Sequence, residues 1–119
     1  MSVLVKYKGK LTFRDYETAY SAFRYLVYEN EDTIFYVPQE YRSNPLYFSA
    51  NLIDSSINID YNGDCGYEEY YRTQTVVSEV VGLSKSGKVI FGTVKYEAEG
   101  WVESEIQPSR KLRKQILGE

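Results

Sequence analysis

The sequence predicts an α+β fold, with one main helix packed on one face of a single antiparallel sheet of about six strands. Apolar residues between positions 16 and 27 recur at the three- and four-residue spacing of one helix face. Several other short segments are rich in the β-branched and aromatic residues that favour strands. The chain has 119 residues, of which 43% are hydrophobic, and it shows neither an internal repeat nor a low-complexity linker. We therefore treat residues 1–119 as a single domain.

The N-terminal part is predicted to form a hairpin followed by the main helix. Residues 2–13, SVLVKYKGKLTF, are interpreted as two strands joined by a turn at 8–10. Asp15 stands at a helix N-cap position, and Glu17 follows where an acid favours the helix dipole. The helix is expected to cover roughly 15–30. Its apolar face comprises Tyr16, Ala19, Tyr20, Phe23, Leu26 and Val27.

Strands are predicted next, in the middle of the chain. The segments TIFYV (33–37), LYFSANLI (46–53) and SINIDY (56–61) have the composition of strands. Asn, Gly and Asp at 62–64 are typical of a short hairpin loop, and a three-residue loop there keeps the flanking apolar residues on a common face.

Residues 60–64 also resemble the beginning of a calcium-binding loop. Asp60, Asn62 and Asp64 occupy alternate positions, as the first calcium ligands do. However, Cys65 stands where the loop requires glycine, and Tyr71 stands where it requires a bidentate glutamate. The hairpin interpretation is therefore preferred, and no metal site is predicted.

Residues 67–106 are interpreted as a meander around a turn at 84–87. This turn would place Val81 opposite Ile90 and would pair apolar residues along both strands. Both strands also carry apolar residues on their second face, which needs a cover: the C-terminal segment, the curl of the sheet, or a second copy of the chain. We favour the second copy, and hence a homodimer. The residues expected to be buried are Val76, Val77, Val80, Val81, Val89, Ile90 and Phe91.

The stretch YEAEGWVESEI (96–106) suggests an acidic strand face. As one continuous strand it would carry Glu97, Glu99, Trp101, Glu103 and Glu105 on one side. Carboxylates two positions apart on a strand are about 6.5 to 7 Å apart, close to the separation in inverting glycosidases, and tryptophan can form a platform for a sugar. Alternating glutamates are also the ordinary way to solvate a sheet edge. The Glu97–Glu105 face therefore supports an alternative hypothesis of a small-ligand or carbohydrate-binding domain or a hydrolase.

Several kinds of chemistry are excluded or disfavoured by composition. The chain has no histidine, so it lacks Ser-His-Asp and Cys-His pairs and histidine-ligated zinc. No glycine-rich phosphate loop is present, and no cofactor is predicted. Cys65 is the single cysteine, which excludes an internal disulfide and, with no signal peptide or apolar membrane span visible, favours the cytoplasm. Whether the protein is an enzyme stays open, and we favour a non-catalytic role.

Charge is distributed unevenly, although the net charge is only −3. Lys6, Lys8, Lys10 and Arg14 make the N-terminus basic, and the tail PSRKLRKQILGE (108–119) is basic as well. The tail is compatible with a short amphipathic helix. Nucleic-acid binding through the two basic termini is a third hypothesis, which the acidic middle of the chain disfavours.

Tyrosine is the most unusual feature of the composition, with 13 residues among 119. Tyrosine gives large contact area with few torsions to freeze, and binding surfaces are enriched in it. Our preferred interpretation is a non-catalytic protein-binding domain that recognises another protein or itself. The candidate binding residues are Tyr41, Tyr47, Tyr61, Tyr67, Tyr70, Tyr71 and Trp101.

Overall fold

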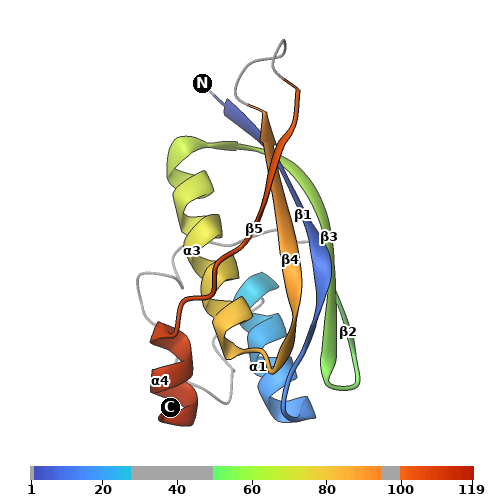
Figure 1. Cartoon of the computed structure of the whole chain (residues 1–119), viewed down its shortest axis with the longest axis vertical. Helices are drawn as coiled ribbons and strands as arrows, with labels where there is room; N and C mark the ends of the chain where they lie inside the picture. The colour runs from blue at the N-terminus through green and yellow to red at the C-terminus, as the bar shows by residue number, and fades with distance from the viewer. Residues whose placement is uncertain (1, 28–49, 95–99) are drawn as a thin grey trace.

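The structure is a computed structural model that describes residues 2–27, 50–94 and 100–119. Its helices and strands are labelled in Figure 1. In order they are β1 (Ser2–Thr12), α1 (Tyr16–Val27), β2 (Ala50–Ile53), β3 (Ser56–Gly66), α3 (Tyr67–Leu83), β4 (Ser86–Val94), β5 (Val102–Glu105) and α4 (Lys111–Leu117).

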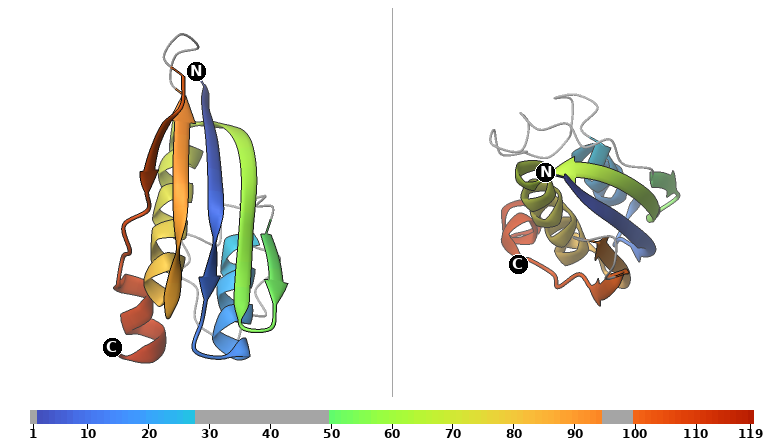
Figure 2. Two further views of the ribbon diagram at one scale, coloured as in Figure 1. Left: turned by 45° about the vertical axis from the view of Figure 1, so that its right-hand side comes forward. Right: turned by 90° about the horizontal axis from the view of Figure 1, so that it is seen from above.

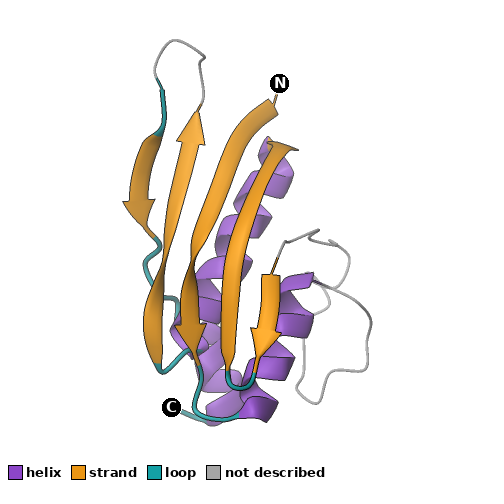
Figure 3. Ribbon diagram, turned by 90° about the vertical axis from the view of Figure 1, so that its right-hand side faces the viewer, coloured by secondary structure: helices purple, strands orange, loops and turns teal. Residues whose placement is uncertain are grey.

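The strands form one antiparallel sheet in the order β2-β3-β1-β4-β5. This confirms the predicted α+β class, with five strands among the described residues in place of about six; the strand predicted at 33–37 lies outside them. The helices lie on one face of the sheet, which Figure 3 shows from its open side. Because β3 and β4 are both antiparallel to β1, they are parallel to each other, and α3 is the crossover that joins them around the central strand.

Strand β1 is continuous, so the predicted turn at residues 8–10 is wrong. Gly9 pairs with Ile59 on one side and with Val89 on the other. A Cβ atom at Gly9 would lie 2.8 Å from the Cα of Val89, closer than real Cβ contacts allow. The glycine therefore serves the close approach of two neighbouring strands, and it does not mark a reversal of the chain.

Strand β3 is also continuous, which overturns the hairpin loop predicted at 62–64. Asn62 pairs with Lys6 and Gly63 with Val5, because β1 offers β3 a partner along its whole length. The space that a side chain at Gly63 would need is occupied by the ring of Tyr61. Because residues 60–64 form part of a strand, they do not form the loop that a calcium site of the predicted kind requires. Among the described residues, no three or more potential metal-ligating side chains are grouped together.

The largest correction concerns residues 67–83, which form helix α3 and not a strand. The predicted pairing of Val81 with Ile90 is therefore wrong. Valine favours strands in general, but Val76, Val77, Val80 and Val81 also have the spacing of one helix face, and burial of that face outweighs the propensity. All residues in the predicted buried set are buried except Ile90, which is partly exposed.

Each face of the sheet has its own character. Val5, Tyr7 and Leu11 of β1 point toward the helices and are buried, whereas Lys8 and Lys10 point to the other side and are exposed. We call these the inner and outer faces. The predicted homodimer required a hairpin that was apolar on both faces, and residues 67–83 form a helix in place of its first strand. Self-association consequently loses its original support.

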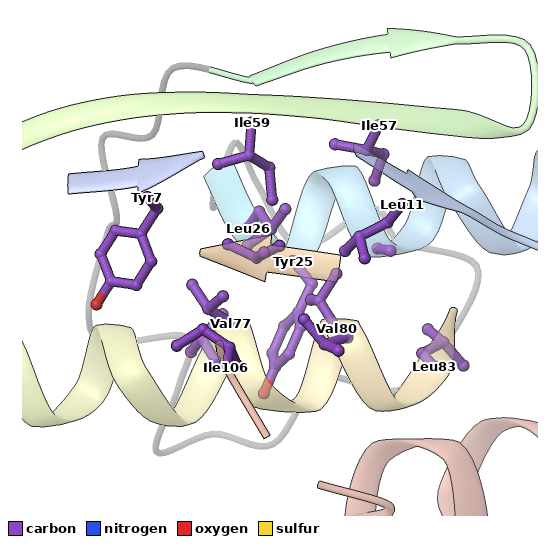
Figure 4. Close-up of a cluster of buried hydrophobic side chains, with 14 of the residues drawn as sticks. Tyr7, Leu11, Tyr25, Leu26, Ile57, Ile59, Val77, Val80, Leu83 and Ile106 are labelled. Carbon is purple, nitrogen blue, oxygen red and sulfur yellow. The ribbon is translucent and has the colours of Figure 1, made fainter. Parts of the chain in front are cut away.

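The core lies between the inner face and helices α1 and α3, as Figure 4 shows. Helix α1 confirms the helix predicted for roughly 15–30, of which 28–30 lie outside the described residues, and α3 is the longer helix. Asp15 caps α1 by accepting a hydrogen bond of 2.8 Å from the Thr18 N–H. This backbone hydrogen bond is the main reason why the pKa of Asp15 is lowered. Inside the core, the Tyr25 hydroxyl donates a hydrogen bond of 2.5 Å to Glu79, which joins α1 to α3.

The C-terminal tail forms the short helix that its sequence allowed, and it docks on its own fold. Leu112 is 2% exposed. The Arg113 guanidinium donates hydrogen bonds of 3.2 to 3.3 Å to the carbonyl oxygens of Gly82, Leu83 and Ser84, which end helix α3. The basic tail therefore lies on the helical side of the molecule, and the lysines of β1 lie on the outer face of the sheet.

Candidate functional site

Strand β5 borders the sheet and presents an edge for which the described residues provide no partner strand (Figure 2). The Ile106 N–H donates a hydrogen bond of 2.9 Å to the Val89 carbonyl, which lies opposite it. This bond shows which residues of β5 direct their backbone N–H and C=O groups toward β4. In an antiparallel ladder the hydrogen-bonded residues alternate. Val102 and Ser104 therefore point their backbone groups toward β4, and Glu103 and Glu105 point theirs away from the sheet.

A groove runs beside this edge, between β5 and helix α3. Its volume is about 480 Å³. One wall is aromatic, with Tyr70 from α3 and Phe91 from β4, and Ser104 of β5 lies opposite Phe91 on the inner face. The remaining lining is mostly polar and comprises Gln74, Thr75, Ser78, Ile106 and Gln107, together with Glu105, whose position on β5 directs its side chain to the outer face.

The aromatic wall is the end of a row of rings that crosses the inner face. The Tyr61 and Tyr7 ring centroids are 6.2 Å apart, and those of Tyr7 and Phe91 are 5.0 Å apart. Tyr70 continues the row at 5.9 Å from Phe91, and Tyr71 meets Tyr70 edge to face at 5.2 Å. These distances are in the range that aromatic pairs prefer, so the groove wall is built from rings that pack on one another.

On the outer face, the same strand carries a small charged cluster. Lys6 of β1 extends over Gly92, where a side chain would collide with its methylene groups. The Lys6 ammonium then lies 2.6 Å from a Glu103 carboxylate oxygen and 4.7 Å from the ring centroid of Trp101. Glu105 lies on the same face, opposite Ile90, and the described part of the chain gives it no ion pair. The two glutamates are therefore electrostatically different.

Some of the candidate residues predicted from the sequence gather around β5. Tyr70 lines the groove, Tyr71 beside it is 63% exposed, and Trp101 directly precedes β5 and is 46% exposed. The predicted shared face of Trp101, Glu103 and Glu105 agrees with the register of β5 and with the contacts of Lys6. Glu97 and Glu99, which the prediction placed on that face, lie outside the described residues.

The other candidates do not extend this site. Tyr61 is partly buried and packs beside Tyr7, but it lies on β3, which is two strands away from β4 and three from β5 in the order of the sheet. Tyr67 begins α3, but the structure describes only its backbone. Tyr41 and Tyr47 fall within residues 28–49, outside the described part of the chain.

The sequence interpretation missed the helical side of the groove. Gln74, Thr75 and Ser78 were assigned to a strand, where Thr75 would point away from Tyr70 and Gln74 and Ser78 would be spread along its length. On a helix, positions 70, 74, 75 and 78 fall on one face because three- and four-residue steps return to the same side. The same spacing is present in the buried valines of α3, and it was the available signal for a helix.

Comparisons with protein-family models, with curated proteins and with solved structures found no match to this chain. Among the described residues, no helix is both long enough and apolar enough to cross a membrane. The functional interpretation consequently depends on the geometry around β5.

Proposed function

We propose that this domain is a non-catalytic protein-binding module that accepts an extended segment of another protein as an additional strand along β5. The observation that carries this proposal is the outward direction of the Glu103 and Glu105 backbone groups beside a groove with an aromatic wall. Peptide recognition by strand addition uses this combination, in which backbone hydrogen bonds give affinity and a pocket for alternate side chains gives specificity.

The geometry provides for both parts of such an interaction. An added strand would exchange hydrogen bonds with the backbone of Glu103 and Glu105. Its side chains would alternate between the two faces, so the residue opposite Ser104 would enter the groove. A volume of about 480 Å³ has room for a large side chain such as an aromatic one.

Electrostatics favours a different protein over a second copy as the partner. If two copies joined antiparallel through β5 with Ser104 at the centre, Glu103 of each would face Glu105 of the other. Like charges directly opposite each other destabilise a strand pair. Charged residues on an edge strand also prevent non-specific pairing with the edge strand of another molecule. A partner strand must therefore bring a charge pattern that complements the edge.

Phage display of random nine-residue peptides tests the proposal. Peptides enriched on the wild-type protein are measured by fluorescence anisotropy against the variants Glu103→Pro and Glu103→Gln. Both variants lose the carboxylate and its ion pair with Lys6, but only proline loses the N–H that points away from the sheet. Proline is tolerated on an edge strand at such a position, and thermal unfolding checks that each variant folds.

The expected result is at least about tenfold weaker binding to Glu103→Pro than to Glu103→Gln. Loss of a hydrogen bond accounts for part of this effect, and the proline ring blocks the approach of the added strand for the rest. Equal binding to the two variants, or a selection that enriches no peptide, contradicts strand addition at β5.

A further inference from the structure

We infer that the β5 edge selects a segment with three consecutive features: a basic residue opposite Glu105, an aromatic residue opposite Ser104, and an uncharged residue opposite Glu103. This inference rests on the proposed function. It specifies the chemistry of the partner, and the reasons come from both faces of β5.

The basic residue is required by the carboxylate of Glu105. Glu105 is exposed on the outer face and has no ion pair among the described residues. A side chain opposite Glu105 on an added strand would lie on the same face, with Cβ atoms about 4.5 to 5.5 Å apart. A lysine or arginine there gains a cross-strand ion pair, and a glutamate there is repelled.

The position opposite Glu103 has the reverse preference. Lys6 already neutralises this carboxylate at 2.6 Å and lies over the Trp101 ring as well. A basic residue of the added strand opposite Glu103 would be repelled by the Lys6 ammonium and would gain little attraction from a carboxylate that is already paired. The described residues therefore offer an added strand one open anionic position on the outer face, at Glu105.

The aromatic residue is required by the groove. The side chain opposite Ser104 lies on the inner face, where Tyr70 and Phe91 form a wall with their rings 5.9 Å apart. Another ring can join this row in the offset or edge-to-face geometry that aromatic pairs prefer. Gln74 and Gln107 line the same groove, and a glutamine amide can form a hydrogen bond with the hydroxyl of a tyrosine.

Strand direction orders these features along the partner. We take the added strand as antiparallel, as all neighbouring strands in this sheet are. The partner residue opposite Glu105 then comes first, followed by the residues opposite Ser104 and Glu103. From N to C, the recognised sequence is basic, aromatic and uncharged.

Synthetic ten-residue peptides rich in threonine and valine test this order, with Lys-Phe-Thr, Thr-Phe-Thr, Glu-Phe-Thr or Thr-Phe-Lys at the centre. The last is a matched control, because it has the composition of the first with the charge on the other side of the ring. We expect Lys-Phe-Thr to bind the wild-type protein about two- to fivefold more tightly than Thr-Phe-Thr or Thr-Phe-Lys, as exposed ion pairs allow. Replacing its Phe by Ala should weaken binding at least about tenfold.

Two protein variants test whether Glu105 and Lys6 cause the charge preference. Glu105→Lys should reverse it, so that Glu-Phe-Thr binds best. Lys6→Gln should release Glu103 and bring Thr-Phe-Lys close to Lys-Phe-Thr. Thermal unfolding is measured for both variants to confirm that each is folded.

The outcomes separate this inference from the proposed function. If all peptides bind equally well and all lose binding to Glu103→Pro, strand addition stands and the charge and aromatic preferences are wrong. If no peptide binds at 1 mM and display enriches none, both are wrong. A preference that Glu105→Lys leaves unchanged also overturns the inference.

Discussion

Replacement of Gly82 by alanine separates the helical propensity of α3 from its packing against the tail. Gly82 lies in the last turn of α3, where alanine would stabilise an isolated helix by up to about 1 kcal/mol. In this fold, however, a Cβ atom at Gly82 would lie 2.7 Å from the carbonyl carbon of Ser109 and closer still to its oxygen. The tail must therefore move away from the helix.

The contacts at risk set the magnitude. The Ser109 N–H donates to the Ser78 carbonyl over 2.9 Å, and the Arg113 hydrogen bonds to the end of α3 depend on the same approach. Each of these two groups of contacts contributes about 1 kcal/mol. Partial exposure of Leu112, which is 2% exposed, costs about 2 kcal/mol more. After the gain in propensity, we expect a net destabilisation of about 3 kcal/mol.

Urea denaturation followed by far-UV circular dichroism measures this change in the free energy of unfolding. Hydrogen exchange of the α4 amides reports whether the tail has moved. The control is Gln115→Ala, an exposed position on α4 that should change stability by less than about 0.5 kcal/mol. If Gly82→Ala is as stable as the wild-type protein or more stable, the proposed close packing of the tail on α3 is refuted.

Three further substitutions test other parts of the fold. Arg113→Met should destabilise the protein by about 1 to 2 kcal/mol in urea denaturation, because the last carbonyl groups of α3 lose their donor; unchanged stability contradicts that role. Asp15→Ala should cost about 0.5 to 2 kcal/mol through loss of the cap to Thr18. Since the pKa of Asp15 is lowered in the folded protein, its contribution is present above the unfolded pKa of about 3.9 and is lost as pH falls through the lower folded value. Unfolding curves at pH 7 and pH 2 should therefore show a smaller Asp15→Ala effect in acid, and an equal effect at both pH values speaks against the cap. Gly9→Ala should lower the thermal unfolding midpoint by several degrees, because its Cβ meets the backbone of Val89, whereas a glycine in an exposed turn would tolerate the change.

Local signals in the sequence were sufficient for α1 and for much of the core. The three- and four-residue spacing of its apolar residues and the cap at Asp15 act within the helix itself, so no other part of the chain is needed to read them. The burial of Val77 and Val80 was also predictable, because an apolar side chain is buried in either a strand or a helix. At the candidate site, alternation along β5 was sufficient to place Trp101 and Glu103 on one face.

Only the tertiary structure decided how the longer segments are used. Gly9 and Gly63 are typical of turns, but each lies within a strand because a neighbouring strand pairs with it, and the close contacts beside each leave no room for a Cβ atom. Residues 67–83 have valines compatible with a strand and a spacing compatible with a helix, and packing on the inner face selects the helix. The groove beside β5 exists only once Tyr70 is brought next to Phe91, which is 21 positions away in the sequence. Contacts between residues so far apart depend on the whole arrangement of strands and helices, and local propensity does not contain that information.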